Sequence, residues 1–375
     1  MLDIMDYITL RKDITFAERG FQEIDALIFS ELAYVDWHNI AEGEILLPDA
    51  CEQFFQENAG TDFALTYAYS TRIPQLVRLL SDTRRYAQVR LMRYQSVFDE
   101  TQEIQFAAVT MQLPDGSLFL AFRGTDSSII GWKEDMKLTY LDEVPSQNLA
   151  WKYARDIYER YCVRKGLFCR RQQLAVPLYL GGHSKGGNLA MYAAIREQTI
   201  QPAITRVYNF DGPGFRPSFY ERYDCTAILD RIHTYVPKDT IIGRLLSHRE
   251  GVTVIDAREN GLSQHDAFNW SVEADGFVTV SGWSEESDRI QQTIDEILMS
   301  KEDDQRKAYI DLIFHVLDRL EIRQISDFNS MGWRQGLNGI RELGSMSARD
   351  RKFLMDVIGF LWTQSKSVFL RPHAG

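Results

Sequence analysis

Residues 179–190 read YLGGHSKGGNLA, which is an apolar segment, then a glycine-rich turn, then residues that favour a helix. The pattern Gly-x-Ser-x-Gly around Ser184 is typical of a sharp strand-to-helix turn, in which Gly182 and Gly186 leave room for the close backbone. Such a turn projects the serine hydroxyl outward, and the next helix directs free N–H groups toward it. We therefore predict that Ser184 is a nucleophile in an α/β fold, the alternative being a structural glycine-rich turn.

A serine nucleophile needs a general base and an acid that orients this base. Among the 7 histidines, His265 lies in a polar loop that follows a β-rich segment, at residues 251–256. His183 adjoins Ser184, but we expect its side chain on the other side of the turn, and His233 falls inside a β-rich segment. His265 is therefore the predicted base.

Two aspartates are candidates for the orienting acid. Asp211 follows the β-rich segment 204–210, and Asp239 follows another one at residues 231–236. Both are expected at the carboxyl edge of a parallel sheet, where open α/β sheets build their sites. We predict Asp239 as the acid and keep Asp211 as the alternative.

A hairpin upstream of the serine offers an oxyanion hole. Two β-rich segments, 106–112 and 117–122, flank the turn sequence LPDG, and the second leads into Gly124-Thr125. We expect Thr125 to donate its backbone N–H and its hydroxyl to the oxyanion. The second donor is expected to be the backbone N–H of Lys185, the residue after the nucleophile.

The lysine side chain itself needs a partner, because a cation is unfavourable at the positive end of a helix dipole. One interpretation is that Lys185 reaches an Asp or Glu at the surface. The other is that it lies at the mouth of the pocket and contacts an acidic head group of the substrate.

Taken together, the chain resembles the class 3 lipases, a family of α/β-hydrolases, over about residues 105–270. It is more similar to an uncharacterised bacterial branch of lipase-like proteins, since Lys185 replaces the usual leucine and the motif around His265 differs. The resemblance implies an ester-hydrolysing Ser-His-Asp site with Thr125 as the oxyanion hydroxyl. The matching pieces are AFRGTD at 121–126 with Trp132 and Asp135, GHSKGG at 182–187, YVPKD at 235–239 and His265.

The expected fold is accordingly an α/β-hydrolase fold with a mostly parallel central sheet and additional N- and C-terminal helices. We expect a single domain over residues 1–375, with a helical part at 1–100, the catalytic sheet at 101–284 and a second helical part at 285–375. The segment 127–136 occupies the place of the family's lid, and an ordinary loop and helix is the alternative there.

The expected function is a serine hydrolase that cleaves a carboxylic ester or thioester through an acyl-enzyme on Ser184. Its substrate would be a small-molecule ester or a lipid-like one, and neither a cofactor nor a metal is expected. Peptidases and acyltransferases use the same residue types. The alternative is a lipase-like pseudoenzyme, or a lipid-binding or regulatory module with a weak site.

Composition narrows the possible partners. The formal net charge of -11 argues against non-specific binding to nucleic acid or anionic membranes. The 4 cysteines lack metal-ligand spacing and indicate reduced thiols. Acidic residues stand near the start, where a secretion signal carries basic ones, and no apolar run reaches the roughly 20 residues of a membrane span. We therefore expect a cytoplasmic protein without an integral membrane segment.

Overall fold

The computed structural model describes residues 1–63, 70–126, 128–165, 171–173, 176–319 and 322. Within them, eight strands form one sheet in the order β1-β2-β3-β4-β7-β8-β9-β10. The strands from β4 onward are parallel, and the three pairs from β1 to β4 are antiparallel. The strands are β1 (Glu44–Leu46), β2 (Arg90–Asp99), β3 (Ile104–Gln112), β4 (Leu118–Phe122), β7 (Leu178–His183), β8 (Ile204–Phe210), β9 (Ile232–Pro237) and β10 (Val252–Ile255).

The mostly parallel central sheet of an α/β fold, predicted from the sequence, is thus confirmed. The expected hairpin is also present, as β3 and β4. A separate two-stranded sheet joins β5 (Val163–Lys165) to β6 (Arg171–Gln173). One difference concerns residues 1–100, which were expected to be helical: they also supply β1 and β2, which extend the antiparallel side of the sheet.

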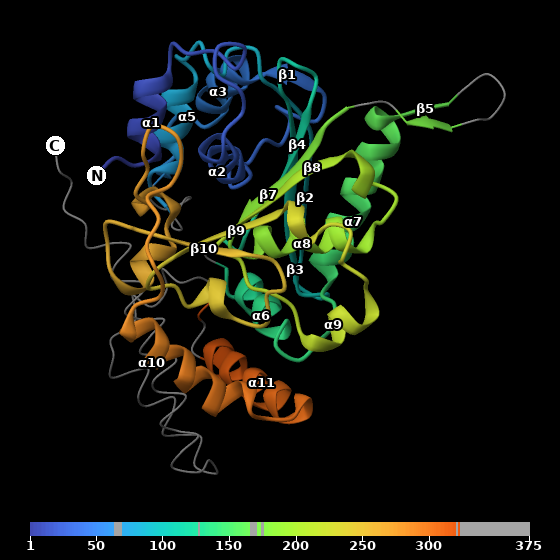
Figure 1. Cartoon of the computed structure of the whole chain (residues 1–375), viewed down its shortest axis with the longest axis vertical. Coiled ribbons are helices and arrows are strands. Elements are labelled where there is room, and N and C mark those ends of the chain that lie inside the picture. The colour runs from blue at the N-terminus through green and yellow to red at the C-terminus, as the bar shows by residue number, and fades with distance from the viewer. Residues whose placement is uncertain (64–69, 127, 166–170, 174–175, 320–321, 323–375) are drawn as a thin grey trace.

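Helices cover both faces of the sheet (Figure 1). One face packs against α1 (Ile4–Arg11), α2 (Glu23–Leu32), α3 (Leu47–Glu57) and α5 (Ile73–Leu80). The other face packs against α7 (Pro145–Ile157), α8 (Lys185–Arg196) and α9 (Pro217–Arg222).

The alternation of side chains along the strands explains how both faces are filled. In β4, Phe119 and Ala121 contact the N-terminal helices, whereas Leu118, Leu120 and Phe122 contact the opposite layer. Successive side chains of a strand point to opposite faces. Because both faces are covered, the strand is apolar throughout instead of alternating with polar residues.

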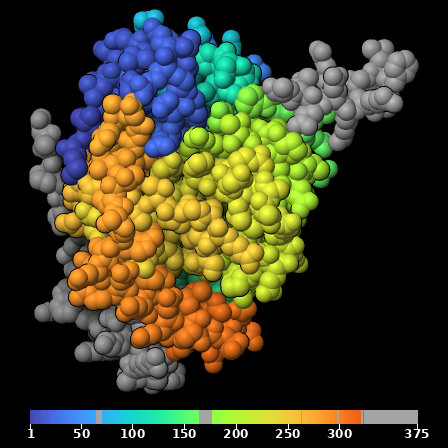
Figure 2. Space-filling view, in the orientation of Figure 1, coloured from blue at the N-terminus to red at the C-terminus, as the bar shows by residue number. Residues whose placement is uncertain are grey.

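The C-terminal helices α10 (Glu285–Ile294) and α11 (Asp303–Arg319) lie at the end of the sheet where the parallel strands terminate (Figure 1). They form the lower part of the surface in the same orientation, in orange (Figure 2). Helix α11 packs on α6 (Ile129–Lys137). Ile310, Ile313 and Phe314 are buried, and Asp303 pairs with Arg216 at 2.6 Å. Residues 320, 321 and 323–375 of the helical part expected at 285–375 lie outside the described residues.

Among the described helices, none combines the length and the apolar composition that crossing a bilayer requires.

Candidate active site

The predicted nucleophile lies in a strained turn between β7 and α8. Ser184 has φ 57° and ψ -134°, a conformation that non-glycine residues rarely adopt. The turn is also sterically closed: a Cβ atom on Gly182 would lie 2.3 Å from the carbonyl carbon of Gly186, and one on Gly186 would lie 2.1 Å from the carbonyl oxygen of Phe122. Ser184 N donates to the carbonyl of Phe210 at 2.8 Å, which ties the turn to β8.

His265 stands between the serine and a carboxylate. Its Nε2 lies 2.9 Å from Ser184 Oγ, and its Nδ1 lies 2.7 Å from Asp211 Oδ2. Because the carboxylate accepts from Nδ1–H, the Nε2 lone pair faces the serine hydroxyl and can accept its proton. The structure therefore brings together the predicted nucleophile and the predicted base.

The carboxylate is that of Asp211, at the end of β8, and not that of the predicted Asp239. Asp211 is fully buried, and its Oδ1 accepts from the hydroxyl of Thr240 and from the N–H of Gly243, the latter at 3.1 Å. Burial raises the pKa of Asp211, while the contact with His265 and these hydrogen bonds act in the opposite direction. The carboxylate is thus held in place on both of its oxygens.

Asp239 instead forms hydrogen bonds with the loop that carries His265. Its N–H donates to Gln264 Oε1 at 3.0 Å, and its Oδ2 accepts from Gln264 Nε2 at 3.0 Å and from Gly261 N at 3.2 Å. The prediction that Asp239 orients the imidazole of His265 is therefore wrong. The reason is spatial: β8 adjoins β7, which ends at the serine, whereas β9 is one strand further away.

The expected oxyanion loop lies beside the nucleophile. A Cβ atom on Gly124 would lie 3.0 Å from Ser184 Cβ and 2.5 Å from the carbonyl oxygen of His183, so only glycine permits this approach. The N–H of Lys185 begins α8 and therefore has no acceptor within the helix. Thr125 is buried, and its hydroxyl donates to Asp135 Oδ2.

The side chain of Lys185 lies neither at the surface nor at a pocket mouth. It is 1% exposed, and its Nζ lies 3.0 Å from Glu134 Oε2 and 3.0 Å from both the carbonyl oxygen and the Oε1 of Gln105. Both positions predicted for this side chain, at the surface and at a pocket mouth, are therefore wrong. The predicted acidic partner is present. Burial alone would lower the pKa of Lys185, but the carboxylates of Glu134 and Asp135 outweigh burial and raise it.

Sequence reasoning missed a second histidine–carboxyl pair behind His265. His183 Nε2 lies 2.8 Å from the carbonyl oxygen of His265, and the two imidazole rings are 4.7 Å apart. A carbonyl can only accept, so Nε2 carries the proton and Nδ1 accepts from the hydroxyl of Tyr34 at 3.2 Å. Glu31 Oε1 lies 3.5 Å from the same Nδ1.

Both members of this pair are wholly buried. Burial raises the pKa of Glu31 well above its ordinary value and lowers that of His183 well below its own. We interpret both as neutral in the folded protein. The sequence signal for Glu31 would have been an acid inside the apolar stretch of α2.

The segment expected to be a lid contains helix α6, which is enclosed on its outer side. The hydroxyl of Ser128 caps the helix by accepting from Gly131 N at 3.2 Å. Lys133 Nζ lies 5.9 Å from the ring centre of Phe314, and Arg306 of α11 donates to the carbonyl of Thr139. Residue 127 lies outside the described residues.

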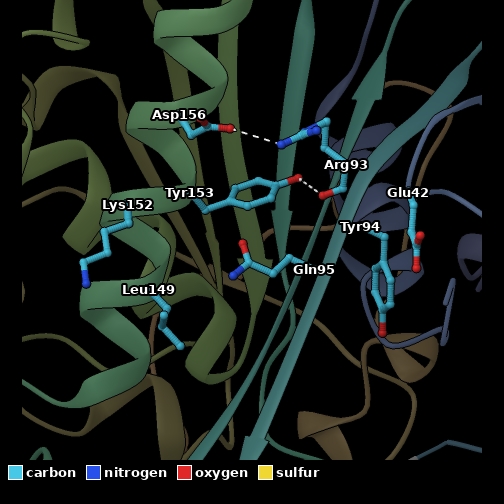
Figure 3. A pocket seen from close by; sticks show the side chains of 8 residues that line it. All are labelled: Glu42, Arg93, Tyr94, Gln95, Leu149, Lys152, Tyr153 and Asp156. Carbon is cyan, nitrogen blue, oxygen red and sulfur yellow. Dashed lines mark hydrogen bonds and ion pairs between the residues drawn. The ribbon is translucent and has the colours of Figure 1, made fainter.

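A separate surface hollow of about 410 Å³ opens between β2 and α7 (Figure 3). Arg93 lies at its rim, with φ 59° at an irregularity of β2, and pairs with Asp156 at 3.4 Å. None of the lining residues is Ser184, His265 or Asp211. They are Glu42, Arg93, Tyr94, Gln95, Leu149, Lys152, Tyr153 and Asp156.

In the described part of the chain, no cluster of histidine, cysteine, aspartate and glutamate side chains is arranged to hold a metal ion.

Residues 80–315, more than half of the chain, match the model of the Mbeg1-like family. The chain belongs to the Mbeg1-like family. The matched range begins just before β2 and includes Ser184, Asp211 and His265, whereas α1, α2 and α3 precede it. The family match therefore covers the strands from β2 to β10 and the candidate site.

The structure is also similar to two lipases. The crystal structure of M37 lipase matches with 15% identity and a TM-score of 0.34, over 60% of this chain and 69% of that one. A lipase from Rhizopus microsporus var. chinensis matches with 13% identity and a TM-score of 0.39, over 71% and 81%. Similarities this low assign neither an activity nor a residue role. Among curated proteins, no significant match was found.

Proposed function

We propose that this protein is a serine hydrolase that cleaves a carboxylic ester or thioester through an acyl-enzyme on Ser184. The observation that supports this most directly is the continuous row Ser184–His265–Asp211, with separations of 2.9 and 2.7 Å. A nucleophile, a base and an orienting carboxylate at hydrogen-bond distance are the recurring arrangement of such enzymes.

In this mechanism His265 Nε2 takes the proton of Ser184 as Oγ attacks the carbonyl carbon of the substrate. Asp211 stabilises the imidazolium that forms, and the N–H of Lys185 with Thr125 binds the negative oxygen of the tetrahedral intermediate. His265 returns the proton to the leaving alcohol or thiol, and the acyl group stays on Ser184. A water molecule then repeats the sequence, with His265 as base, and releases the acid.

The proposal is tested by covalent labelling with a fluorophosphonate probe and by turnover of p-nitrophenyl esters of increasing chain length. The wild type should be labelled. Ser184→Ala should lose labelling and lower turnover by on the order of 10³-fold or more, while remaining folded. Ser96, which is exposed on β2, provides the control: Ser96→Ala should behave as the wild type.

Undiminished ester turnover in a folded Ser184→Ala protein would refute the assignment. A folded wild type that neither reacts with the probe nor hydrolyses any of the esters would favour the alternative, a lipase-like binding or regulatory module.

A further inference from the structure

Lys185 joins three elements beside the candidate oxyanion hole. Its ammonium extends from the start of α8 to Gln105 of β3 and Glu134 of α6, and it has almost no exposed surface. Burying an ammonium group costs several kcal/mol unless it is paired and hydrogen-bonded. The three contacts at 3.0 Å meet that requirement.

Glu134 is a fully occupied partner. Its Oε2 accepts from Lys185 and from Gln105 N at 3.3 Å, and its Oε1 accepts from Ser146 N at 2.9 Å. One carboxylate therefore already balances the one ammonium in the buried cluster.

Asp135 is a second carboxyl group next to the same ammonium. Its Oδ1 is buried and has no hydrogen-bond partner among the described residues, but it lies 3.7 Å from Lys185 Nζ. Its Oδ2 accepts the hydroxyl of Thr125. Lys185, Asp135 and Thr125 thus form a continuous row that leads from a buried charge to the expected oxyanion donor.

We propose that Lys185 is a positioning residue that acts through Asp135 on the hydroxyl of Thr125. This inference rests on the proposed hydrolase function. Before reaction, the Thr125 hydroxyl donates a hydrogen bond to the carboxylate of Asp135. When the substrate carbonyl oxygen becomes negative, this hydrogen turns toward it, and the ammonium of Lys185 stabilises the carboxylate that has lost the hydrogen bond.

When Asp135 is ionised, loss of the ammonium makes its carboxylate retain the hydroxyl hydrogen more strongly. The stabilisation of the transition state falls, while binding of the uncharged ester is unaffected. The effect is therefore expected in kcat and not in KM. It should be smaller than the roughly 10²-fold or greater loss typical when an oxyanion donor is deleted.

The test removes the ammonium of Lys185 together with the carboxylate of Glu134, because either substitution alone would leave the other member of this ion pair charged and unpaired inside the protein. In Lys185→Met/Glu134→Gln we expect kcat on p-nitrophenyl butyrate, and the rate of fluorophosphonate labelling, to fall about 10-fold with KM unchanged. Lys133→Met, on α6 beside Glu134, is the control. Lys133 pairs with Glu103 at 2.6 Å, outside the Lys185–Asp135–Thr125 row, and its variant should keep wild-type rates.

The decisive measurement repeats the substitution in a Thr125→Val background. If Lys185 acts through the hydroxyl, adding Lys185→Met/Glu134→Gln to Thr125→Val should change kcat by less than about twofold, because the hydroxyl that Lys185 positions is already absent. An equal loss in both backgrounds would overturn the proposal in favour of a merely structural role, and so would an unchanged kcat in the wild-type background.

Asp135→Ala keeps the Lys185–Glu134 pair and covers the case in which the double variant does not fold. It should not lower kcat in the wild-type background, because it removes the acceptor that competes with the oxyanion for the Thr125 hydrogen, and a fall in kcat there would overturn the proposal. Labelling that persists in Ser184→Ala would instead count against the proposed function itself.

Discussion

At the scale of single residues, the position of Asp211 decides how the candidate site works. Asp211 adopts φ 53°, a conformation that Asp and Asn tolerate better than most residues. Its N–H donates to the carbonyl of Tyr235 at 2.8 Å, which fixes the carboxylate beside β9 and under His265. A side chain held this firmly can keep the imidazole in one tautomer.

We therefore expect Asp211→Asn to lower kcat by about 10³-fold or more, because the amide favours the wrong tautomer of His265. Asp239→Asn should have a much smaller effect, since Asp239 holds Gln264 and not the imidazole. The two variants are compared by turnover of a p-nitrophenyl ester at fixed pH. If Asp239→Asn were the more damaging change, Asp239 would again be the candidate acid.

At the scale of elements, the turn from β7 into α8 carries the site, and its glycines are required by contact distances. Gly186 lies so close to β4 that a Cβ atom would overlap the backbone of Phe122. The same closeness brings the end of β4, and with it Gly124, against Ser184. The packing of two strand ends thus places the nucleophile next to its expected oxyanion donors.

Gly186→Ala should consequently destabilise the protein by on the order of 3 kcal/mol, because backbone has to move to relieve the overlap. Gly282→Ala is the matched control, since no atom lies within 4 Å of the Cβ that it would add. Chemical denaturation measures the difference in the free energy of unfolding. Equal stability of the two variants would show that the turn relaxes at little cost.

Local pattern was sufficient to predict some of these elements from the sequence. The turn around Ser184 and the β3–β4 hairpin have characteristic glycine and turn residues. The choice between Asp211 and Asp239 was not local, because both follow a strand and only the order of strands in the sheet separates them. The partners of Lys185 come from β3 and α6, which are distant in sequence, so no spacing indicated them.

At the scale of the whole molecule, two helical layers enclose the sheet, and buried ionisable groups lie between layers. Glu31 of α2 contacts His183 at the end of β7 across this boundary. Burial keeps its pKa well above the ordinary value of 4.5, so the folded protein holds it neutral where the unfolded chain ionises it. This difference lowers stability progressively as the pH rises above about 4.5.

Glu31→Gln should therefore stabilise the protein at pH 8 and have little effect near pH 4, because glutamine is neutral in both states. The measurement is Tm of the variant and the wild type over this range. The advantage of the variant should widen as the pH rises. A constant difference at every pH would mean that Glu31 does not change its protonation state on unfolding.

The contact between α11 and α6 has a consequence for how the protein is made. Arg306 and the carbonyl of Thr139 that it binds are 167 residues apart in the sequence. During translation, the strands and the nucleophile turn leave the ribosome long before α11 does. Until α11 has been made, the outer side of α6 lacks this packing partner, and Asp135, which lies on α6, acquires that support only then.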